Sequence, residues 1–202
     1  ISILTTFDCL SLLCFAAFCA ICDIFSNLRV KFIVGKLWQI EAEYDILGEF
    51  SFMIKILFVC HGNICRSPMA MFIMRKLVQD KGLENEFLIE SAATSTEEIG
   101  NDMYPCAKRK LSEKKIPYAR HRARQIRADE YDEWDHIFCM DRNNMRNIQY
   151  IIHEDPKQKI HKLLDGKDVA DPWYTDDFET AYQDIYTGCV TWLDRILKVN
   201  KN

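Results

Sequence analysis

Hydrophobic residues after position 54 follow two periods that alternate along the chain. The run KILFVC (55–60) is continuously apolar and β-favouring, which is typical of a strand covered on both faces in a parallel sheet. Apolar residues from Met69 to Leu77 then recur at spacings of three and four, which predicts a helix with one buried face that ends near Asp80. This region therefore begins as strand, loop and helix.

The same alternation continues toward the C-terminal end of the sequence. Further strands are predicted at 87–93, 136–140 and 159–164, and further helices at 106–115, 143–152 and 178–197. This order predicts an α/β fold of three layers, in which a four-stranded parallel sheet carries helices on both faces. Such sheets bind ligands at the carboxyl ends of their strands, so the loop after the first strand is the first place to look for chemistry.

That loop reads CHGNICRS over residues 60–67 and is followed by Pro68. Ser67 is predicted to be the N-cap of the helix and Pro68 its first residue. Backbone N–H groups of such a loop can converge on one point, where the helix dipole adds positive potential and Arg66 adds a planar fork of donors. We therefore expect a phosphate-binding loop that holds a tetrahedral dianion.

The same positive potential favours the thiolate of Cys60. A thiolate beneath a phosphate can attack phosphorus and form a phosphocysteine that water hydrolyses, while Arg66 stabilises the equatorial oxygens. Gly62 permits a positive φ or a close backbone approach, and Asn63 tolerates the left-handed region. A buried cysteine and a surface arginine could share this spacing by chance. The preceding strand and the Ser-Pro pair favour the catalytic interpretation.

Residues 59–68, VCHGNICRSP, match the signature V-C-x-G-N-I-C-R-S-P, and through them the sequence resembles the low-molecular-weight protein tyrosine phosphatase family. The similarity continues in family order and covers residues 53 to about 198. The further motifs are SAATS (91–95), HRARQI (121–126), CMDRNN (139–144) and DPWYTDDFE (171–179). The resemblance implies a cysteine-dependent enzyme that needs no metal or other cofactor and whose partner is a phosphotyrosyl protein or peptide.

The resemblance also implies roles for individual residues. Cys60 matches the nucleophile, Arg66 the transition-state clamp, and Ser67 a hydroxyl donor to the thiolate. The substrate phosphate would lie against the rest of the loop as well, which consists of His61, Gly62, Asn63, Ile64 and Cys65. Asn63, Ser91 and His121 match positions that hold the loop in its strained shape. His121 could instead be an ordinary surface histidine in a basic stretch.

Three residues near position 171 complete the expected site. Asp171 matches the general acid, because departure of a tyrosine phenolate demands a proton. Trp173 and Tyr174 are expected to wall an aromatic slot, although adjacent aromatic residues can also serve only packing. The family often has another aromatic residue after SAATS, where this chain has Thr96, Glu97 and Glu98. Peptide preference therefore cannot be transferred from relatives.

Cys65 is part of the matched motif and has an implied redox role. In such enzymes this neighbour can trap oxidised Cys60 as a reversible disulfide, which prevents irreversible oxidation. The alternative is that Cys65 is only a small packing residue.

Three other functions remain open at the level of sequence. A protein arginine phosphatase is a close relative in which Thr commonly replaces the residue at Ile64. An arsenate reductase would need resolving cysteines, and Cys139 has no nearby downstream partner. A non-catalytic phosphate-binding or redox-sensing module would not require Cys60, Arg66 and Asp171 together, and all three are present.

Charge argues against some partners. The formal net charge of the 202 residues is −4, whereas a dedicated nucleic-acid binder usually has a strongly basic surface. Residues 108–127 nevertheless contain nine Lys or Arg and one acidic residue, and 165–184 contain seven acidic residues and one Lys. The basic stretch is either a solvated face or a surface that steers acidic partners. We expect a monomer or weak dimer with no nucleic-acid partner.

Residues 1–52 differ from the remainder of the sequence. All methionines lie from Met53 onward, and the apolar run 9–22 is too short to cross a bilayer and lacks a preceding basic residue. We expect 1–52 to be a non-native upstream extension or a disordered or apolar segment, and 53–202 to be a phosphatase domain without a membrane segment. Four of the nine cysteines lie in the first 22 residues, and the other five show no paired framework, which favours the cytoplasm.

Overall fold

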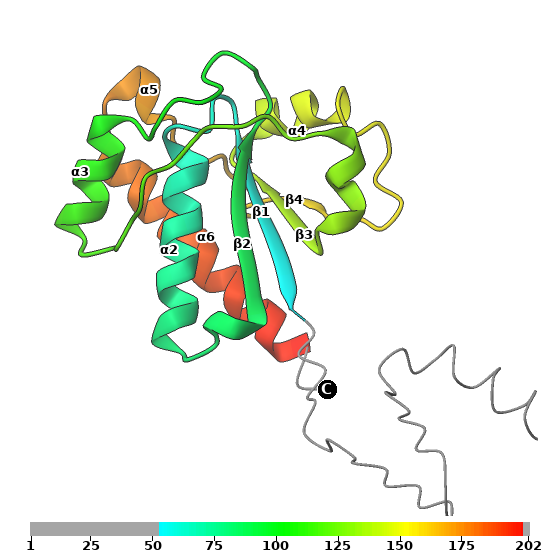
Figure 1. Ribbon diagram of the computed structural model, residues 1–202, viewed down its shortest axis with the longest axis horizontal. Coiled ribbons are helices and arrows are strands. Elements are labelled where there is room, and N and C mark those ends of the chain that lie inside the picture. The colour runs from blue at the N-terminus through cyan, green and yellow to red at the C-terminus, as the bar shows by residue number, and fades with distance from the viewer. Residues whose placement is uncertain (1–52, 200–202) are drawn as a thin grey trace, which may run out of the picture. The chain divides into compact units, whose positions relative to one another are not determined.

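The computed structural model describes residues 53–199, and the extension expected at 1–52 lies outside the described residues. Four strands form one sheet: β1 (Ile54–Cys60), β2 (Phe87–Ala93), β3 (His136–Cys139) and β4 (Ile160–Lys162). Their order is β2-β1-β3-β4 and every pairing is parallel (Figure 1). The predicted four-stranded parallel sheet is confirmed.

Helices cover both faces of this sheet, as the sequence predicts (Figure 1). The helices are α2 (Arg66–Asp80), α3 (Pro105–Glu113), α4 (Arg142–Gln149), α5 (Pro172–Thr175) and α6 (Phe178–Val199). Side chains of β1 alternate between two buried clusters: Ile56 and Phe58 pack with α2, α3 and α6, and Leu57 and Val59 pack on the α4 side. All four are fully buried, which explains why the strand reads as one apolar run.

Helix α2 differs from its prediction in two respects. It begins at Arg66, so Ser67 lies inside the first turn and is not the N-cap. The helix is also buried well beyond one face, since Met71 and Met74 are as inaccessible as Met69. The physical reason is that α6 packs beside α2 within the same buried cluster and covers a second side of it.

The other predicted boundaries lie within three residues of the observed ones. Short elements were not predicted: a 3-10 helix at Glu84–Glu86, another at Ala128–Glu133, and α5. Each is six residues or shorter, so none contains two full turns of apolar periodicity. Of these elements only α5 borders the site described below.

Candidate active site

The carboxyl end of β1 and the first turn of α2 bring Cys60 and Ser67 together. The sulfur of Cys60 lies 3.1 Å from the hydroxyl oxygen of Ser67. It also accepts a hydrogen bond of 3.3 Å from the backbone N–H of Asn63. Cys60 is 3% exposed. Because Ser67 is one residue inside the helix, its hydroxyl faces the sulfur and does not cap the helix.

Asn63 fixes the shape of the loop at residues 60–67 from within. Its φ is +58°, the left-handed conformation expected from the sequence, and its side chain is fully buried. The amide nitrogen donates hydrogen bonds of 2.9 Å to the hydroxyls of both Ser67 and Ser91. The amide oxygen accepts one of 3.2 Å from the backbone N–H of Arg124. One amide therefore joins the loop to β2 and to the segment after α3.

His121 completes the contacts of Asn63. Its Nε2 lies 2.8 Å from the backbone carbonyl oxygen of Asn63 and 3.1 Å from the side-chain oxygen. Both partners are acceptors, so Nε2 carries the proton and donates. Burial lowers the pKa of His121, which keeps the ring neutral at pH 7. His121 is buried and belongs to the site, unlike a surface histidine of a basic stretch.

Backbone contacts hold the loop on both sides. The N–H groups of Thr94 and Ser95 donate to the carbonyls of Cys60 and His61, at 2.8 and 3.0 Å. The φ of Gly62 is not positive. Instead, a Cβ there would lie 3.1 Å from Cγ of Glu98, a tight contact that glycine avoids.

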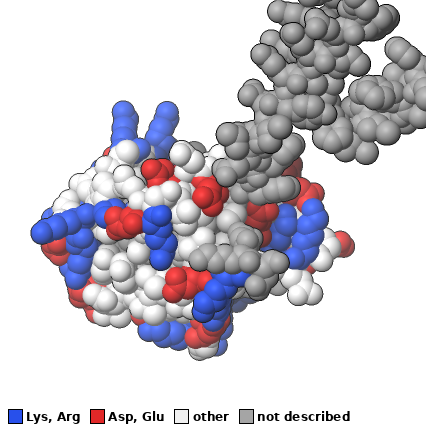
Figure 2. Space-filling view, turned by 90° about the horizontal axis from the view of Figure 1, so that it is seen from below, with Lys and Arg blue, Asp and Glu red and all other residues white. Residues whose placement is uncertain are grey.

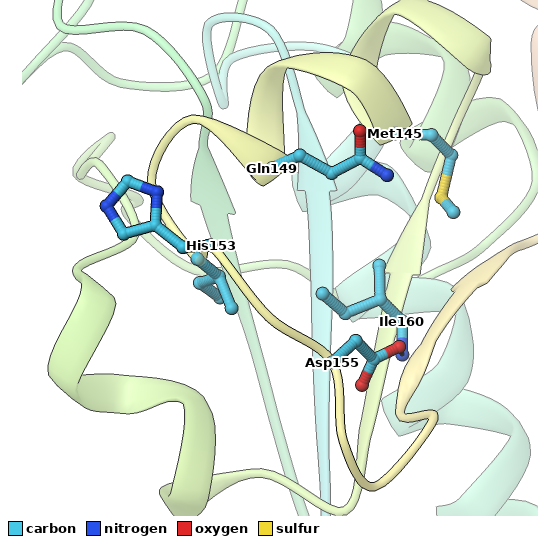
Figure 3. Close-up of a pocket in the computed structure, with 6 residues that line it drawn as sticks. Met145, Gln149, His153, Asp155 and Ile160 are labelled. Atoms are coloured by element: carbon cyan, nitrogen blue, oxygen red, sulfur yellow. Dashed lines mark hydrogen bonds between the residues drawn. The ribbon is translucent and has the colours of Figure 1, made fainter.

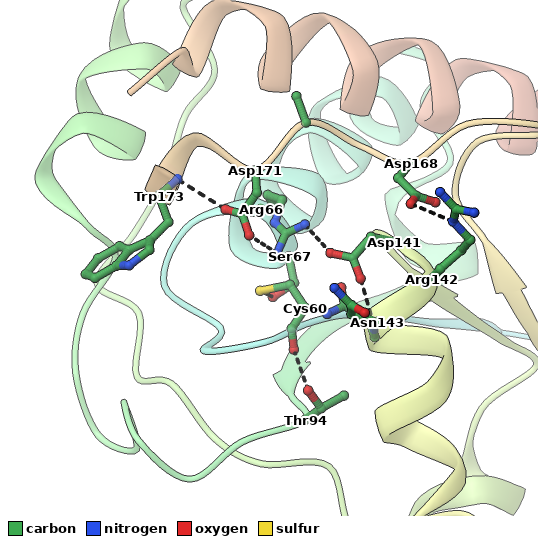
Figure 4. Close-up of polar contacts among 12 residues, drawn as sticks. Cys60, Arg66, Ser67, Thr94, Asp141, Arg142, Asn143, Asp168, Asp171 and Trp173 are labelled. Carbon is green, nitrogen blue, oxygen red and sulfur yellow. Dashed lines mark hydrogen bonds and ion pairs between the residues drawn. The ribbon is translucent and has the colours of Figure 1, made fainter. Parts of the chain in front are cut away.

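Arg66 is enclosed between two carboxylates (Figure 4). One guanidinium nitrogen, Nη1, lies 2.5 Å from Oδ2 of Asp141, and Nη2 lies 2.5 Å from Oδ2 of Asp171. Burial alone would lower the pKa of Arg66, but Cys60, Asp171 and Asp141 outweigh that effect and raise it. The guanidinium therefore remains charged while its side chain is only 4% exposed.

Asp141 is a site residue whose role could not be read from the sequence. It is the N-cap of α4, where its Oδ1 accepts a 2.6 Å hydrogen bond from the backbone N–H of Asn144, while Oδ2 binds Arg66. An aspartate before a helix is a sequence signal for an N-cap. The pattern gave no signal for the arginine bound by the second oxygen, because Arg66 lies 75 positions earlier.

Arg124 is a second residue that sequence reasoning missed. Besides its backbone contact with Asn63, its guanidinium forms two hydrogen bonds, of 2.9 and 2.8 Å, with the buried carboxylate of Glu130. This pair anchors the segment that also carries His121.

Asp171 and the aromatic residues after it form one border of the candidate active site. Asp171 is the N-cap of α5, because Oδ1 accepts a 3.1 Å hydrogen bond from the backbone N–H of Trp173 while Oδ2 contacts Arg66. Trp173 is 56% exposed and meets the ring of Tyr104 edge-on, with centroids 5.6 Å apart. Tyr174 is 84% exposed. Tyr104 comes from the segment before α3 and was not predicted to contribute to this border.

Cys65 is a buried residue of the loop itself. Burial raises the pKa of its thiol to about 12, and the neighbouring Cys60 and Asp171 add to the shift. Cys65 therefore stays protonated at neutral pH. Ile64, the adjacent residue, is also buried, and its carbonyl accepts a 2.8 Å hydrogen bond from the N–H of Tyr104.

A separate hollow of about 210 Å³ lies between α4 and β4 (Figure 3). Its lining includes Asp155, whose carboxylate is occupied by the hydroxyl of Tyr131 at 2.6 Å and by the N–H groups of Lys159 and Ile160. None of the loop residues 60–67 lines it. Within residues 53–199, no group of three or more His, Cys, Asp or Glu is arranged to hold a metal ion, and no helix is long and apolar enough to span a membrane.

Five of the nine basic residues in the stretch 108–127 form ion pairs within the fold. These ion pairs are Lys108 with Asp102, Lys110 and Lys114 with Glu179, Arg124 with Glu130, and Arg127 with Asp129. Acidic and basic side chains are also interspersed on the face seen from the end where β1 begins (Figure 2). These contacts favour the solvated-face interpretation over a surface that steers acidic partners.

An α/β fold with a parallel sheet and a Cys-x5-Arg loop between the first strand and the first helix defines a class of cysteine-dependent phosphatases. The family model for the low molecular weight phosphotyrosine protein phosphatases matches residues 55–202, and the chain belongs to that family. It is therefore a cysteine-dependent protein-tyrosine-phosphatase, as the resemblance implied.

Of three similar proteins, the first two agree with this assignment, and the third shares the fold but is named an arginine phosphatase. The chain is 41% identical over 151 residues to the low molecular weight phosphotyrosine protein phosphatase of Gallus gallus, covering 69% of this chain and 94% of that protein. The crystal structure of YfkJ from Bacillus subtilis has a TM-score of 0.69 at 38% identity, covering 72% of this chain and 96% of the other. A Drosophila arginine phosphatase, DARP, has a TM-score of 0.64 at 27% identity, with 71% and 98% covered.

Proposed function

We propose that this enzyme hydrolyses phosphotyrosine in proteins or peptides through a phosphocysteine on Cys60, with Asp171 as the general acid. The observation that carries the proposal is the environment of the Cys60 sulfur. The backbone N–H of Asn63 donates to it at 3.3 Å, the Ser67 hydroxyl lies 3.1 Å away, and the charged guanidinium of Arg66 is buried in the same loop. Such donors favour a thiolate, which is the nucleophilic form.

In the first step the Cys60 thiolate attacks phosphorus. An S–P bond forms, the P–O bond to tyrosine breaks, and Asp171 transfers its proton to the departing phenolate. Water then attacks the phosphocysteine and gives up a proton to the Asp171 carboxylate. The S–P bond breaks, which releases inorganic phosphate and restores the thiolate of Cys60.

Arg66 stabilises the phosphoryl oxygens during both steps. Asp141 keeps hold of Nη1, whereas the Nη2 that now binds Asp171 turns to the phosphate. Binding of the dianion therefore separates Arg66 from Asp171 and frees the acid to reach the leaving oxygen. The exposed Trp173, braced by Tyr104, offers an aromatic surface for the tyrosyl ring.

The test is turnover by the full chain on four substrates: phenyl phosphate, a phosphotyrosyl peptide, a phosphoarginyl protein, and arsenate supplied with a thiol. We expect hydrolysis of the first two in the presence of a chelator, and loss of both in Cys60→Ser. Faster release of phosphate from the phosphoarginyl protein would assign the enzyme to arginine phosphatases. Thiol-dependent arsenate reduction without phosphate release would make it a reductase, and tight phosphate binding without turnover would make it a binding module.

A further inference from the structure

The mouth of the site is bordered by two segments that carry negative charge. The loop after β2 (residues 94–101) supplies Glu97 and Glu98, and residues 171–177 supply Asp171, Asp176 and Asp177. Neither segment contains a Lys or an Arg. The guanidinium of Arg66 is only 4% exposed and is already paired with Asp141 and Asp171.

Glu97 is tied directly to the residue that follows the nucleophile. Its Oε2 lies 3.0 Å from Nε2 of His61, and the two side chains are 71% and 51% exposed. The 94–101 loop cannot move far from this position, because Thr94 and Ser95 are bonded to the carbonyls of Cys60 and His61. Glu97 therefore stands at the rim immediately beside the loop that receives the phosphate.

Glu98 reinforces this side of the rim. Its Cγ approaches the backbone of Gly62, and its carboxylate accepts a 2.7 Å hydrogen bond from the amide of Asn101. Segment 171–177 also carries Trp173, which packs edge-on against Tyr104. A substrate would thus meet carboxylates from both segments and one exposed aromatic surface.

From this arrangement we infer that Glu97 is a specificity-determining residue that selects phosphotyrosyl peptides with a Lys or Arg within two positions of the phosphotyrosine. The inference rests on the proposed function. Once the phosphate is held at Cys60, the peptide backbone lies at the rim, where a cationic side chain can pair with Glu97. An acidic side chain in the same place is repelled by Glu97. Attraction of basic residues and repulsion of acidic residues therefore both favour peptides with Lys or Arg.

The size of the effect follows from the exposure of the carboxylate. An exposed ion pair changes affinity by up to about fivefold, and the repulsion of an acidic residue adds a comparable factor. Salt screens charges at this exposure, so the preference must shrink as ionic strength rises. His61 already occupies one oxygen of Glu97, which limits the gain from a single additional cation.

The test uses three phosphotyrosyl peptides that differ only in having Lys, Gln or Glu beside the phosphotyrosine. For each enzyme variant, kcat/KM on a peptide is divided by kcat/KM on phenyl phosphate, which has no neighbouring residues. We expect the wild type to prefer the Lys peptide over the Glu peptide by about tenfold at low salt, Glu97→Gln to reduce this ratio to about two, and Glu97→Lys to reverse it. Glu84→Gln is the matched control, because Glu84 is exposed in a 3-10 helix before β2 and should leave the wild-type ratio unchanged.

Equal rates on the three peptides in the wild type would overturn the inference, and so would a tenfold preference that persists in Glu97→Gln. Either result leaves the proposed function intact, since the peptides are still hydrolysed. Failure on all three peptides with retained phenyl phosphate hydrolysis contradicts the proposed phosphotyrosine substrate, and the inference with it.

Discussion

Arg66 and Asp171 are direct partners, with 2.5 Å between Nη2 and Oδ2. The contact joins the side chain proposed to bind the phosphate to the one proposed to protonate the leaving group. It brings together the first turn of α2 and the N-cap of α5, which lie 105 positions apart in the chain. The proposed phosphate binding by Arg66 and the proposed protonation by Asp171 can therefore be distinguished only by variants that alter one of these two residues.

Asp171→Asn removes the proposed proton donor while keeping a side chain that can cap α5. We expect kcat on phenyl phosphate, whose leaving group is poor, to fall by roughly 10² or more. The loss should be much smaller for nitro-substituted phenyl phosphates, which leave without help. A plot of kcat against the pKa of the leaving phenol measures this, with Asp176→Asn as the neighbouring control. A uniform loss across all leaving groups would show that Asp171 is not the acid.

Asp141→Asn tests the orientation of Arg66. Asparagine is as good an N-cap as aspartate, so the stability of α4 should change little, while the loss of charge beside Arg66 lowers kcat by about tenfold. Asp141→Ala should lower kcat and also cost about 1 kcal/mol of unfolding free energy. Kinetics and urea unfolding together measure the two effects. Asp168→Asn, which alters a nearby ion pair with Lys162, should leave kcat unchanged; an equal loss there would remove the role assigned to Asp141.

Cys65→Ser tests the expected redox role. The sulfenic acid of oxidised Cys60 can condense with the protonated thiol of Cys65, releasing water and forming a disulfide that added thiol reduces. After limited peroxide treatment we expect the wild type to recover most of its activity with dithiothreitol and Cys65→Ser to recover little. Cys106→Ser, at a half-buried position, should recover like the wild type. Equal recovery of all three proteins would leave Cys65 with a packing role alone.

The stability of the fold should depend on pH through one buried and two half-buried histidines. Burial lowers the pKa values of His121, His136 and His161, and the nearby His161 lowers that of His136 further. Below pH about 6.5 the unfolded chain binds protons that the folded protein excludes, so the unfolding free energy falls as the pH falls. Each histidine contributes at most about 1.4 kcal/mol per pH unit.

Urea unfolding between pH 5.0 and 7.5 measures this slope. His136→Phe should make it shallower, because His136 stacks on Phe138 and its Nδ1 is buried without a partner among residues 53–199. His153→Gln, at an exposed position, is the control. A slope that is unchanged in His136→Phe would contradict the assignment of part of this pH dependence to His136.

The sequence predicted those parts of the molecule that depend on local pattern. The strand at 55–60 is apolar on both faces because helices cover both, and the loop motif at 60–67 has a fixed relation to that strand and to α2. The wider burial of α2 was missed because apolar residues outside its predicted face, such as Met71 and Met74, belong to a buried cluster that includes residues of α6, an element that begins only at Phe178.

The site residues that escaped prediction have one property in common. Asp141, Arg124 and Tyr104 reach the loop through contacts that join segments distant in the chain, namely to Arg66, Asn63 and Ile64. Nothing in the spacing of such residues identifies their partners before the topology is known. Asp171 was found only because its motif resembles that of a family, since an isolated Asp-Pro pair usually begins a turn.

The amide of Asn63 has a consequence for how the protein is made. Its four contacts come from β2, from α2 and from the segment that carries His121. A growing chain that has emerged only as far as β2 already contains the cysteine and the arginine, but it lacks the imidazole and the main-chain N–H that close the loop around Asn63. The surroundings of the Cys60 sulfur are thus completed only after Arg124 has been added, when about half of the described domain has been synthesised.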